Sequence, residues 1–391
     1  MKCSQRIEFL IIGGGPAGSA AAIALAAAGR EVVVVERTDY TGPRVGETLP
    51  PAANPILARL GLTSDPASSS HLRCPGTVCC WGHEDPYLND FLFDPDGDGL
   101  HLDRAAFDAA MARKAANAGA TVLVGCEVRS CCLAAVGWTV AISGPCGDRR
   151  FLVSTLIDAA GRRPWRGRPS RRRGFDRQVA LVGTFEVQSS TAADRRTWIE
   201  AVHSGWWYSA SLPDNRLAVA YFTDADLLDA PKGNRSARWG ALLCETRLTR
   251  DRLRLGRPMG DLRVVAASST IADPIVGNRY VAIGDAACTI DPLSSQGILD
   301  ALFSGIDAAE ALVAPNRSQA IRTYARGIVA RFHNDLHTRQ QFCQSERRWP
   351  DSPFWKRRVR TPKPLAPVAA SRVTTAAPDP SGINQLIAAS E

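Results

Sequence analysis

The chain has 391 residues, a hydrophobic fraction of 45% and a charged fraction of 22%, which predict one or two globular domains with a large core. Its net charge is +8, and almost all of its basic residues are arginine. Because no recognised module or interleaving of aromatic and basic residues accompanies the charge, we do not expect a nucleic-acid partner. The eleven cysteines form no C-x-x-C pair, which favours small buried thiols in a reducing compartment over a metal site.

Residues 9–29 are apolar enough to suggest a membrane span or a signal peptide. The sequence Gly13-Gly14-Gly15-Pro16 interrupts this run, and no charged region or cleavage site frames it. No other segment approaches the apolar length that a membrane span needs. We therefore expect a cytoplasmic protein without a membrane span.

The first predicted elements are a buried strand over 7–12, a glycine-rich turn over 13–18, a helix of small residues that reaches residue 28, and a second strand over 32–35. This order of strand, turn and helix is the context that the G-x-G-x-x-G dinucleotide fingerprint requires. By itself the fingerprint is compatible with NAD, NADP or FAD.

The glycines of the fingerprint have different roles. Gly13 allows the tight turn, Gly15 lets a pyrophosphate approach the backbone, and Gly18 lets helix and strand pack closely. The start of the helix offers free N–H groups to phosphates. Glu36 ends the second strand, where an acidic side chain accepts hydrogen bonds from ribose hydroxyls.

The next part of the chain continues a mixed α/β pattern. Asp103 is a suitable N-cap, and Phe107 and Met111 follow at helical spacing, so a helix is predicted over 102–118. Residues 70–100 are rich in Pro, Gly and Asp. The other predicted elements here are a loop over 43–51, a short helix over 52–60, a strand over 121–124 and a small antiparallel meander over 126–157.

Residues 178–270 predict a second unit of longer alternating strands, and the chain then returns to the first unit. The expected strands are 179–187, 206–212 and 216–222, with a helix over 236–248. After them we expect a strand over 278–283 and helices over 296–313 and 317–342. Residues 345–391 predict an extended or partly disordered tail rich in Pro and Arg.

Four motifs in order decide between the cofactors. They are GGGPAG at 13–18, RVGETLPP at 44–51, HLDRAAFD at 101–108 and GDAACTIDPLSSQGI at 284–298. Through them the chain resembles the FAD-dependent aromatic-hydroxylase superfamily, whose fold flavin-dependent halogenases share, over roughly residues 5–340.

The resemblance implies a mixed α/β (α+β) fold in which a Rossmann-like FAD-binding domain carries an inserted antiparallel-sheet substrate domain. The FAD-binding domain would comprise residues 1–177, with the meander over 126–157, and residues 271–344. The substrate domain would comprise residues 178–270, and residues 345–391 would be the tail.

The same resemblance implies which residues surround FAD. In the first half of the chain they are Gly13, Gly15, Pro16, Ala17, Gly18, Glu36, Arg37, Arg44, Arg104, Val128, Asp158 and Gly161. In the late motif they are Gly284, Asp285, Pro292, Gln296, Gly297 and Ile298. NAD(P)H, or a separate flavin reductase, would supply the electrons.

Within the superfamily, flavin halogenases carry an essential lysine upstream of a tryptophan, in the segment that here runs from His71 to Trp81. This segment has no lysine, and Arg73 is a poor substitute because a guanidinium does not lose its proton. The W-x-W-x-I-P signature of halogenases is missing, and Ser294 stands where they have a glutamate. These departures argue against halogenation.

The chain looks more like flavoprotein monooxygenases that oxygenate a tryptophan within a peptide or protein during quinone-cofactor maturation. The resemblance rests on RVGETLPPAANPILARLGL, on Gly205-Trp206-Trp207-Tyr208 and on DPLSSQGI. It implies hydroxylation of an electron-rich ring, such as indole, through a flavin C4a-hydroperoxide. Strand alternation would place Trp206 and Tyr208 on one face, as candidate substrate-pocket residues, and Trp207 on the other.

Several features stay open. Glu47, Asp291 with Pro292, and His101 are candidates for acid–base catalysis, and Asp291 is the best placed of the three because it precedes the helix expected to face the flavin. The arginines between 162 and 177 are either a solvated loop or a docking surface for an acidic partner. A halogenase, a double-bond reductase of the geranylgeranyl-reductase kind and a non-catalytic flavin-bearing assembly factor remain alternatives to a monooxygenase.

Overall fold

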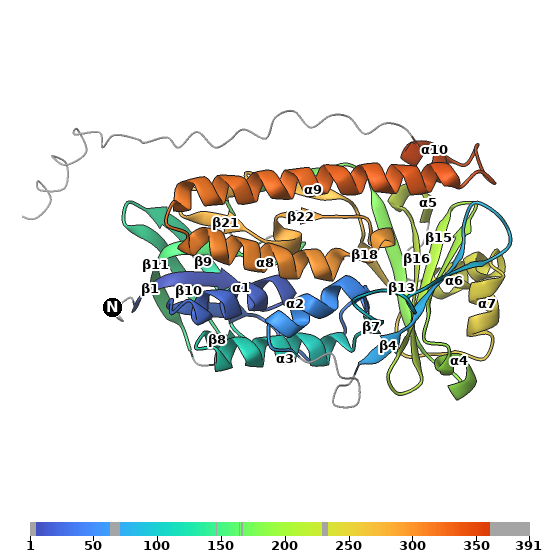
Figure 1. The fold of residues 1–391 in the computed structure, drawn as a ribbon, viewed down its shortest axis with the longest axis horizontal. Coiled ribbons are helices and arrows are strands. Elements are labelled where there is room, and N and C mark those ends of the chain that lie inside the picture. The colour runs from blue at the N-terminus through green and yellow to red at the C-terminus, as the bar shows by residue number, and fades with distance from the viewer. Residues whose placement is uncertain are drawn as a thin grey trace, which may run out of the picture.

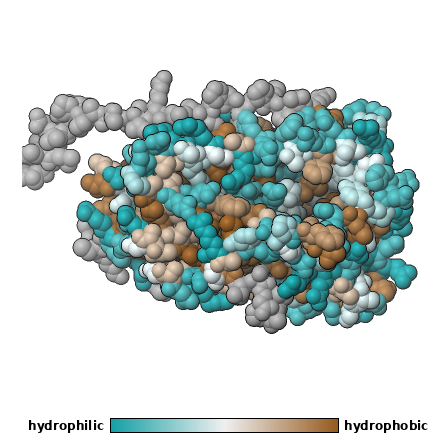
Figure 2. All heavy atoms as spheres, viewed as in Figure 1, coloured by the Kyte–Doolittle hydropathy of each residue, from teal (hydrophilic) through white to brown (hydrophobic). Residues whose placement is uncertain are grey.

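The computed structural model describes residues 5–62, 71–145, 147–163, 165, 167–228 and 234–359. Figure 1 shows two sheet-based halves, with helix α9 (Arg317–Ser345) running along both of them. The visible face is mainly hydrophilic, with apolar side chains scattered over it (Figure 2). No helix of the described residues is long and apolar enough to cross a membrane.

The first half is built on a sheet with a parallel centre. Its strands run in the order β20 (Val276–Gly277), β21 (Tyr280–Ala282), β11 (Arg149–Asp158), β1 (Gln5–Ile12), β2 (Val32–Glu36) and β8 (Thr121–Val124). The pairings of β1 with β11 and β2, and of β11 with β21, are parallel. Both faces are covered, which explains why β1 and β2 are nearly continuous runs of Ile, Leu and Val.

Four helices pack on this sheet and on one another. They are α1 (Pro16–Ala27), α3 (Arg104–Asn117), α8 (Gly297–Val313) and α9. Helix α1 packs against α3 and α8, and α9 packs along α8 (Figure 1). The Asp103 carboxylate caps α3, as predicted, by accepting a hydrogen bond from the Ala106 N–H at 3.0 Å.

The predicted meander forms, but it is not a separate unit. Strands β9 (Glu127–Ala134) and β10 (Gly137–Ser143) pair in antiparallel order and β10 continues onto β11. Strand β11 also lies beside β1, with register from Gln5 opposite Phe151 to Ile12 opposite Asp158. The third strand of the meander is therefore the centre of the nucleotide sheet.

The second half is a sheet in the order β17 (Arg257–Pro258), β13 (Gln178–Glu186), β16 (Arg216–Asp224), β15 (Gly205–Leu212), β14 (Thr197–Val202), β5 (Gly76–Cys80) and β6 (Tyr87–Asp90). Strand β18 (Arg263–Ala266) pairs with β13 on the same side as β17. The sheet is therefore larger than the predicted unit over 178–270, because β5 and β6 join it from the segment rich in Pro, Gly and Asp.

One outer face of this sheet is covered by α6 (Arg235–Cys244) and α7 (Leu248–Leu253), where the sequence predicts a single helix over 236–248. The buried Glu200 explains the break. Its carboxylate accepts hydrogen bonds from the N–H groups of Arg247 and Thr249, at 2.7 and 2.8 Å, and so starts a new helix.

The remaining elements are short. They are β3 (Thr48–Leu49), β4 (Leu72–Cys74), β7 (Gly99–His101), β12 (Arg171–Gly174), β19 (Thr270–Asp273), β22 (Cys288–Thr289), α2 (Asn54–Arg59), α4 (Ser189–Ala193), α5 (Ala225–Leu228) and the 3₁₀ turns η1 (Pro51–Ala53), η3 (Gly284–Ala286) and η4 (Pro292–Ser294).

The predicted tail is wrong for residues 353–359, which form helix α10 (Pro353–Val359). Phe354 and Trp355 are almost fully buried there, and the Trp355 indole N–H donates to the Val202 carbonyl at 3.0 Å. Apolar burial against the second sheet thus orders a segment whose composition predicts an extended chain. Residues 360–391 lie outside the described residues.

Candidate active site

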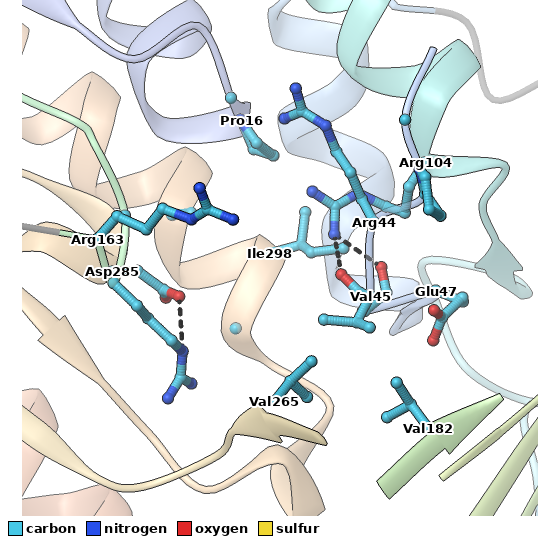
Figure 3. Close-up of a pocket in the computed structure, with 18 of the residues that line it drawn as sticks. Pro16, Arg44, Val45, Glu47, Arg104, Arg163, Val182, Val265, Asp285 and Ile298 are labelled. Atoms are coloured by element: carbon cyan, nitrogen blue, oxygen red, sulfur yellow. Dashed lines mark hydrogen bonds and ion pairs between the residues drawn. The ribbon is translucent and has the colours of Figure 1, made fainter. Parts of the chain in front are cut away.

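A cavity of about 1410 Å³ lies between the two halves. One side is lined by the glycine-rich turn, the end of β2, the loop after it and the start of α8 (Figure 3). The other side is the inner face of the second sheet, with side chains from β13, β15, β16 and β18. A cavity of this size at the carboxyl ends of parallel strands is where this kind of fold binds a dinucleotide.

The glycine-rich turn fits a pyrophosphate. A Cβ at Gly13, where φ is +106°, would lie 2.3 Å from the Ala159 carbonyl oxygen, and a Cβ at Gly18 would lie 1.9 Å from the Gly13 carbonyl oxygen. A Cβ at Gly15 would meet nothing within 4 Å. Gly13 and Gly18 are therefore needed for packing, whereas Gly15 keeps space open in the cavity at the start of α1.

This difference makes a testable prediction. Gly15→Val should weaken FAD binding by about 3 kcal/mol, or about 100-fold, because the side chain fills the space next to the helix N–H groups. The melting temperature of the FAD-free protein should hardly change. Gly18→Ala should instead lower that temperature, since its methyl group collides with backbone. FAD titration and thermal unfolding of both variants measure this, and equal destabilisation of the FAD-free forms would contradict it.

Glu36 is buried beside this turn. One carboxylate oxygen accepts the Gly14 N–H at 2.8 Å, and the other accepts the Thr38 N–H and hydroxyl at 2.9 and 2.5 Å. The side chain therefore fixes the turn and lines the cavity where a ribose is expected. Arg37 and Val128 also line this end of the cavity.

The loop after β2, residues 38–47, crosses the cavity wall, and we call it the strap. The Arg44 guanidinium pairs with Asp108 at 2.7 Å, and Arg104 pairs with the same carboxylate at 3.1 Å. Arg104 also donates to the carbonyl oxygens of Val45 and Gly46 at 2.6 and 3.0 Å (Figure 3). Asp108 has no exposed side-chain surface, so one buried carboxylate holds Arg44 of the strap and Arg104 of α3.

Sequence reasoning did not assign Asp108, although it lies in the HLDRAAFD motif. Its position four residues after Arg104 on α3 is an ordinary helical ion-pair spacing. Only the tertiary structure brings Arg44, from 64 residues earlier in the chain, to the same carboxylate.

The late motif lies on the opposite wall. Asp285, Pro292, Gly297 and Ile298 line the cavity, and a Cβ at Gly297 would meet nothing within 4 Å. Arg162 pairs with Asp285 at 3.2 Å (Figure 3). The start of α8 therefore presents free backbone N–H groups to this wall, which suits the negative end of a reduced flavin ring.

Six predicted residues do not line the cavity, namely Gly18, His101, Asp158, Gly284, Gln296 and Asp291. Asp158 is fully buried, pairs with Arg168 at 2.6 Å and accepts the Tyr280 hydroxyl at 2.9 Å. Gly284 has φ of +55°, and a Cβ there would lie 2.6 Å from the Ala17 side chain. Asp158 and Gly284 therefore support the cavity from behind.

The arginines between 162 and 177 do not form one solvated loop. Arg168 is buried against Asp158, and Arg172 donates to the Asp285 carbonyl at 2.6 Å and to the Thr270 hydroxyl. Burial lowers the pKa of Arg172 to about 10. Arg166 lies outside the described residues. The buried members of the run therefore hold the late motif in place, and do not form a docking surface.

The second sheet supplies an aromatic wall. The Trp206 ring stacks on Phe222 with centroids 4.0 Å apart, and the Tyr208 hydroxyl lies 2.6 Å from the Thr48 hydroxyl. All three aromatic residues line the cavity. Trp207 points to the other face, against Trp239, which is the separation that strand alternation predicts. Small side chains, such as Ala180 and Ala220, leave room beside the wall.

The acid–base candidates differ sharply in position. Glu47 lines the cavity at the end of the strap, near Val182 of the second sheet (Figure 3). Burial raises the pKa of Glu47 to about 7, although the Arg104 guanidinium opposes the shift. A carboxyl group with a pKa near neutral pH can give or take a proton at working pH.

Asp291 and His101 lie elsewhere. The Asp291 carboxylate caps η4 through the Leu293 N–H at 3.0 Å and faces Arg339 at 3.8 Å, and burial raises its pKa. His101 is fully buried against the Thr197 hydroxyl at 3.0 Å, and burial lowers its pKa to about 3. Among the three candidates the geometry favours Glu47, whereas the sequence favours Asp291.

With the site described, comparison with known proteins is informative. The sequence matches the tryptophan halogenase family over residues 97–377 and a NAD(P)-binding Rossmann-like domain over residues 11–51. The chain belongs to the tryptophan halogenase family. This flavoprotein is thus an FAD-dependent oxidoreductase, as the resemblance implies.

Three relatives place the flavoprotein within the family. It is 31% identical over 363 residues to the putative FAD-dependent oxidoreductase LodB of Marinomonas mediterranea, covering 90% of this chain and 97% of LodB. The myxobacterial chondrochloren halogenase CndH has a TM-score of 0.83 at 24% identity, covering 90% and 86% of the two chains. QhpG, a peptidyl tryptophan dihydroxylase essential for tryptophylquinone cofactor biogenesis, has a TM-score of 0.75 at 23% identity, covering 92% and 80%. The fold class predicted from the sequence is confirmed.

Proposed function

We propose that this flavoprotein is a monooxygenase that hydroxylates an electron-rich aromatic ring, namely the indole of a tryptophan within a peptide or protein. The observation that carries the proposal is the character of the cavity beside the second sheet. It has an aromatic wall, the Glu47 carboxyl group lines it at the end of the strap, and none of the described residues that line it is a lysine. A halogenase needs such a lysine, whereas ring hydroxylation does not.

FAD, held by the glycine-rich turn, Glu36, the strap and the start of α8, supplies the electron transfer to dioxygen. The chain's own residues position the ring and move the proton. An indole fits beside Trp206 and Phe222, whose stacked rings favour a flat aromatic ligand. When oxygen bonds to a ring carbon, that carbon must release its proton, and a Glu47 carboxylate oxygen accepts it.

A peptide-borne tryptophan is supported by one structural neighbour. QhpG, whose fold this chain shares, acts on a peptidyl tryptophan. The alternative is halogenation, which the family and the similarity to CndH favour. Arg73, the basic residue nearest to the expected lysine, pairs with Asp98 at 3.7 Å on the surface and does not line the cavity. That position argues against a halogenase.

Product analysis tests the proposal. The FAD-loaded protein would be given a reductant, isotopically heavy dioxygen and a short peptide with one tryptophan, and the control peptide would have phenylalanine instead. We expect heavy oxygen in the tryptophan peptide alone. Reoxidation of the flavin with no labelled product from this peptide, from free tryptophan or from other indoles would contradict the proposal and favour a reductase.

The electron donor is a separate question. We propose that NAD(P)H reduces the bound FAD, directly or through a flavin reductase. Anaerobic mixing with NADH or NADPH, with flavin absorbance as the readout, distinguishes the two routes. Bleaching without a reductase indicates direct reduction, and bleaching that requires a reductase indicates the second route. If neither arm bleaches the flavin, NAD(P)H is not the donor.

A further inference from the structure

Four tryptophans form a continuous path from the cavity to the surface. Trp206 of β15 lies 6.5 Å from Trp81, which lies 5.2 Å from Trp355 of α10, measured between ring centroids. Trp355 in turn lies 6.4 Å from Trp349, and the two rings are stacked. Trp206 lines the cavity and Trp349 is partly exposed to solvent. The four residues come from three separate parts of the sequence.

The two middle indoles are buried and held in place. The Trp81 indole N–H donates to the Phe342 carbonyl at 2.8 Å, and the Trp355 indole N–H donates to the Val202 carbonyl at 3.0 Å. A carbonyl oxygen on the indole N–H stabilises the positive charge that a ring acquires when it loses an electron. Both rings are therefore suited to brief one-electron oxidation.

Trp349, at the outer end of this path, is suited to release the positive charge of an oxidised ring to solvent. Arg348 lies over the Trp349 ring at 4.3 Å, but its own charge is offset by an ion pair with Glu346 at 2.6 Å. Water can reach Trp349, so an oxidised ring there can lose its N–H proton to solvent. The buried rings have no such outlet, since their N–H groups face carbonyl oxygens.

We propose that these tryptophans form a redox chain that carries an oxidising equivalent out of the cavity and so protects the site. Superoxide, formed when the reduced cofactor gives one electron to dioxygen without substrate, takes one electron from Trp206 and two protons from water and leaves as hydrogen peroxide. Trp81 then reduces Trp206, Trp355 reduces Trp81, and Trp349 reduces Trp355. The oxidised Trp349 gives its proton to water, and a small thiol returns one electron and one proton.

Close packing alone accounts for buried indoles elsewhere in the second sheet. Trp207 and Trp239 lie 4.8 Å apart on the opposite face, where they fill a core and do not line the cavity. Packing alone does not explain why four neighbouring indole rings form a continuous path from the cavity wall to solvent. The Trp207–Trp239 pair therefore serves as the matched control.

Illumination with blue light tests electron transfer along the four tryptophans without enzymatic turnover. Blue light excites oxidised flavin, which then takes an electron from a nearby indole, and transient absorbance records the tryptophan radical. In the FAD-loaded protein we expect a long-lived radical, because the charge moves away to Trp349. Trp81→Phe should abolish the long-lived radical, and Trp239→Phe should leave it unchanged. An unchanged lifetime in Trp81→Phe would overturn the proposal.

Peptide mapping after illumination in air gives a second readout. We expect oxidised product at Trp349 in the unmodified protein and at Trp206 in Trp81→Phe. Trp349→Phe changes a partly exposed residue, so this variant tests the tryptophan redox chain if Trp81→Phe fails to fold. It should move the oxidised product to Trp355. Oxidation that stays at Trp206 in the unmodified protein would also overturn the proposal.

Discussion

Replacing Glu47 with glutamine is expected to lower kcat by a factor of about 10²–10⁴, the usual contribution of a positioned acid or base. Glutamine keeps the shape of the side chain but cannot accept a proton. Because the pKa of Glu47 is raised to about 7, its base form predominates above neutral pH. The rate of the unmodified protein should therefore rise with pH through about 7, and that rise should be missing in Glu47→Gln.

The free energy of unfolding of the FAD-free protein, measured at two pH values, tests the raised pKa of Glu47 without an activity assay. The pKa of Glu47 is raised from 4.5 to about 7 in the fold, so its stabilising contribution is complete below pH 4.5 and is lost as the pH rises through 7. Glu47→Gln should match the unmodified protein at pH 4.5. At pH 8 it should be about 3 kcal/mol more stable. An equal difference at both pH values would contradict the raised pKa, whereas a kcat like that of the unmodified protein would contradict only the catalytic role.

Replacing Asp108 with asparagine is expected to lower the free energy of unfolding by about 3 kcal/mol, because it removes the buried carboxylate that two partly buried arginines share. Asp108 has no exposed side-chain surface and faces Arg44 and Arg104 at 2.7 and 3.1 Å. The strap should loosen with it, since Arg104 also holds the carbonyl oxygens of Val45 and Gly46. FAD affinity should fall in parallel.

Asp351→Asn is the matched control for this variant. Asp351 pairs with Lys356 at 2.9 Å, but its side chain is 94% exposed, so the loss should be below about 1 kcal/mol. Denaturant unfolding of both variants, with an FAD titration of each, makes the comparison. If Asp108→Asn and Asp351→Asn lost equal stability and kept equal FAD affinity, the strap would not depend on the buried carboxylate.

Local patterns in the sequence were sufficient to predict the nucleotide half. The glycine-rich turn, the apolar runs of β1 and β2 and the Asp103 cap of α3 are all local signals, and the structure has each of them. Strand alternation likewise separates Trp206 from Trp207. These features follow from neighbouring residues.

The features that sequence reasoning missed depend on contacts between distant residues. Strands β5 and β6 are short and lie among turn-forming residues, so only the pairing of β5 with β14, and of β6 with β5, reveals them. Asp291 precedes Pro292 at a helix start, which suggests a catalytic position, yet its carboxylate turns away to cap η4. Arg168 and Arg172 look solvated in an arginine-rich run, but Arg168 pairs with the buried Asp158 and Arg172 donates to the Asp285 carbonyl.

The central claim is that oxygen, and not halide, is transferred to a tryptophan ring. The most direct test is one reaction with the FAD-loaded protein, a reductant, heavy dioxygen, saturating bromide and a tryptophan peptide, with the product read by mass spectrometry. We predict that the peptide gains heavy oxygen and no bromine. A product that carries the isotope pattern of bromine would contradict the claim and establish a halogenase.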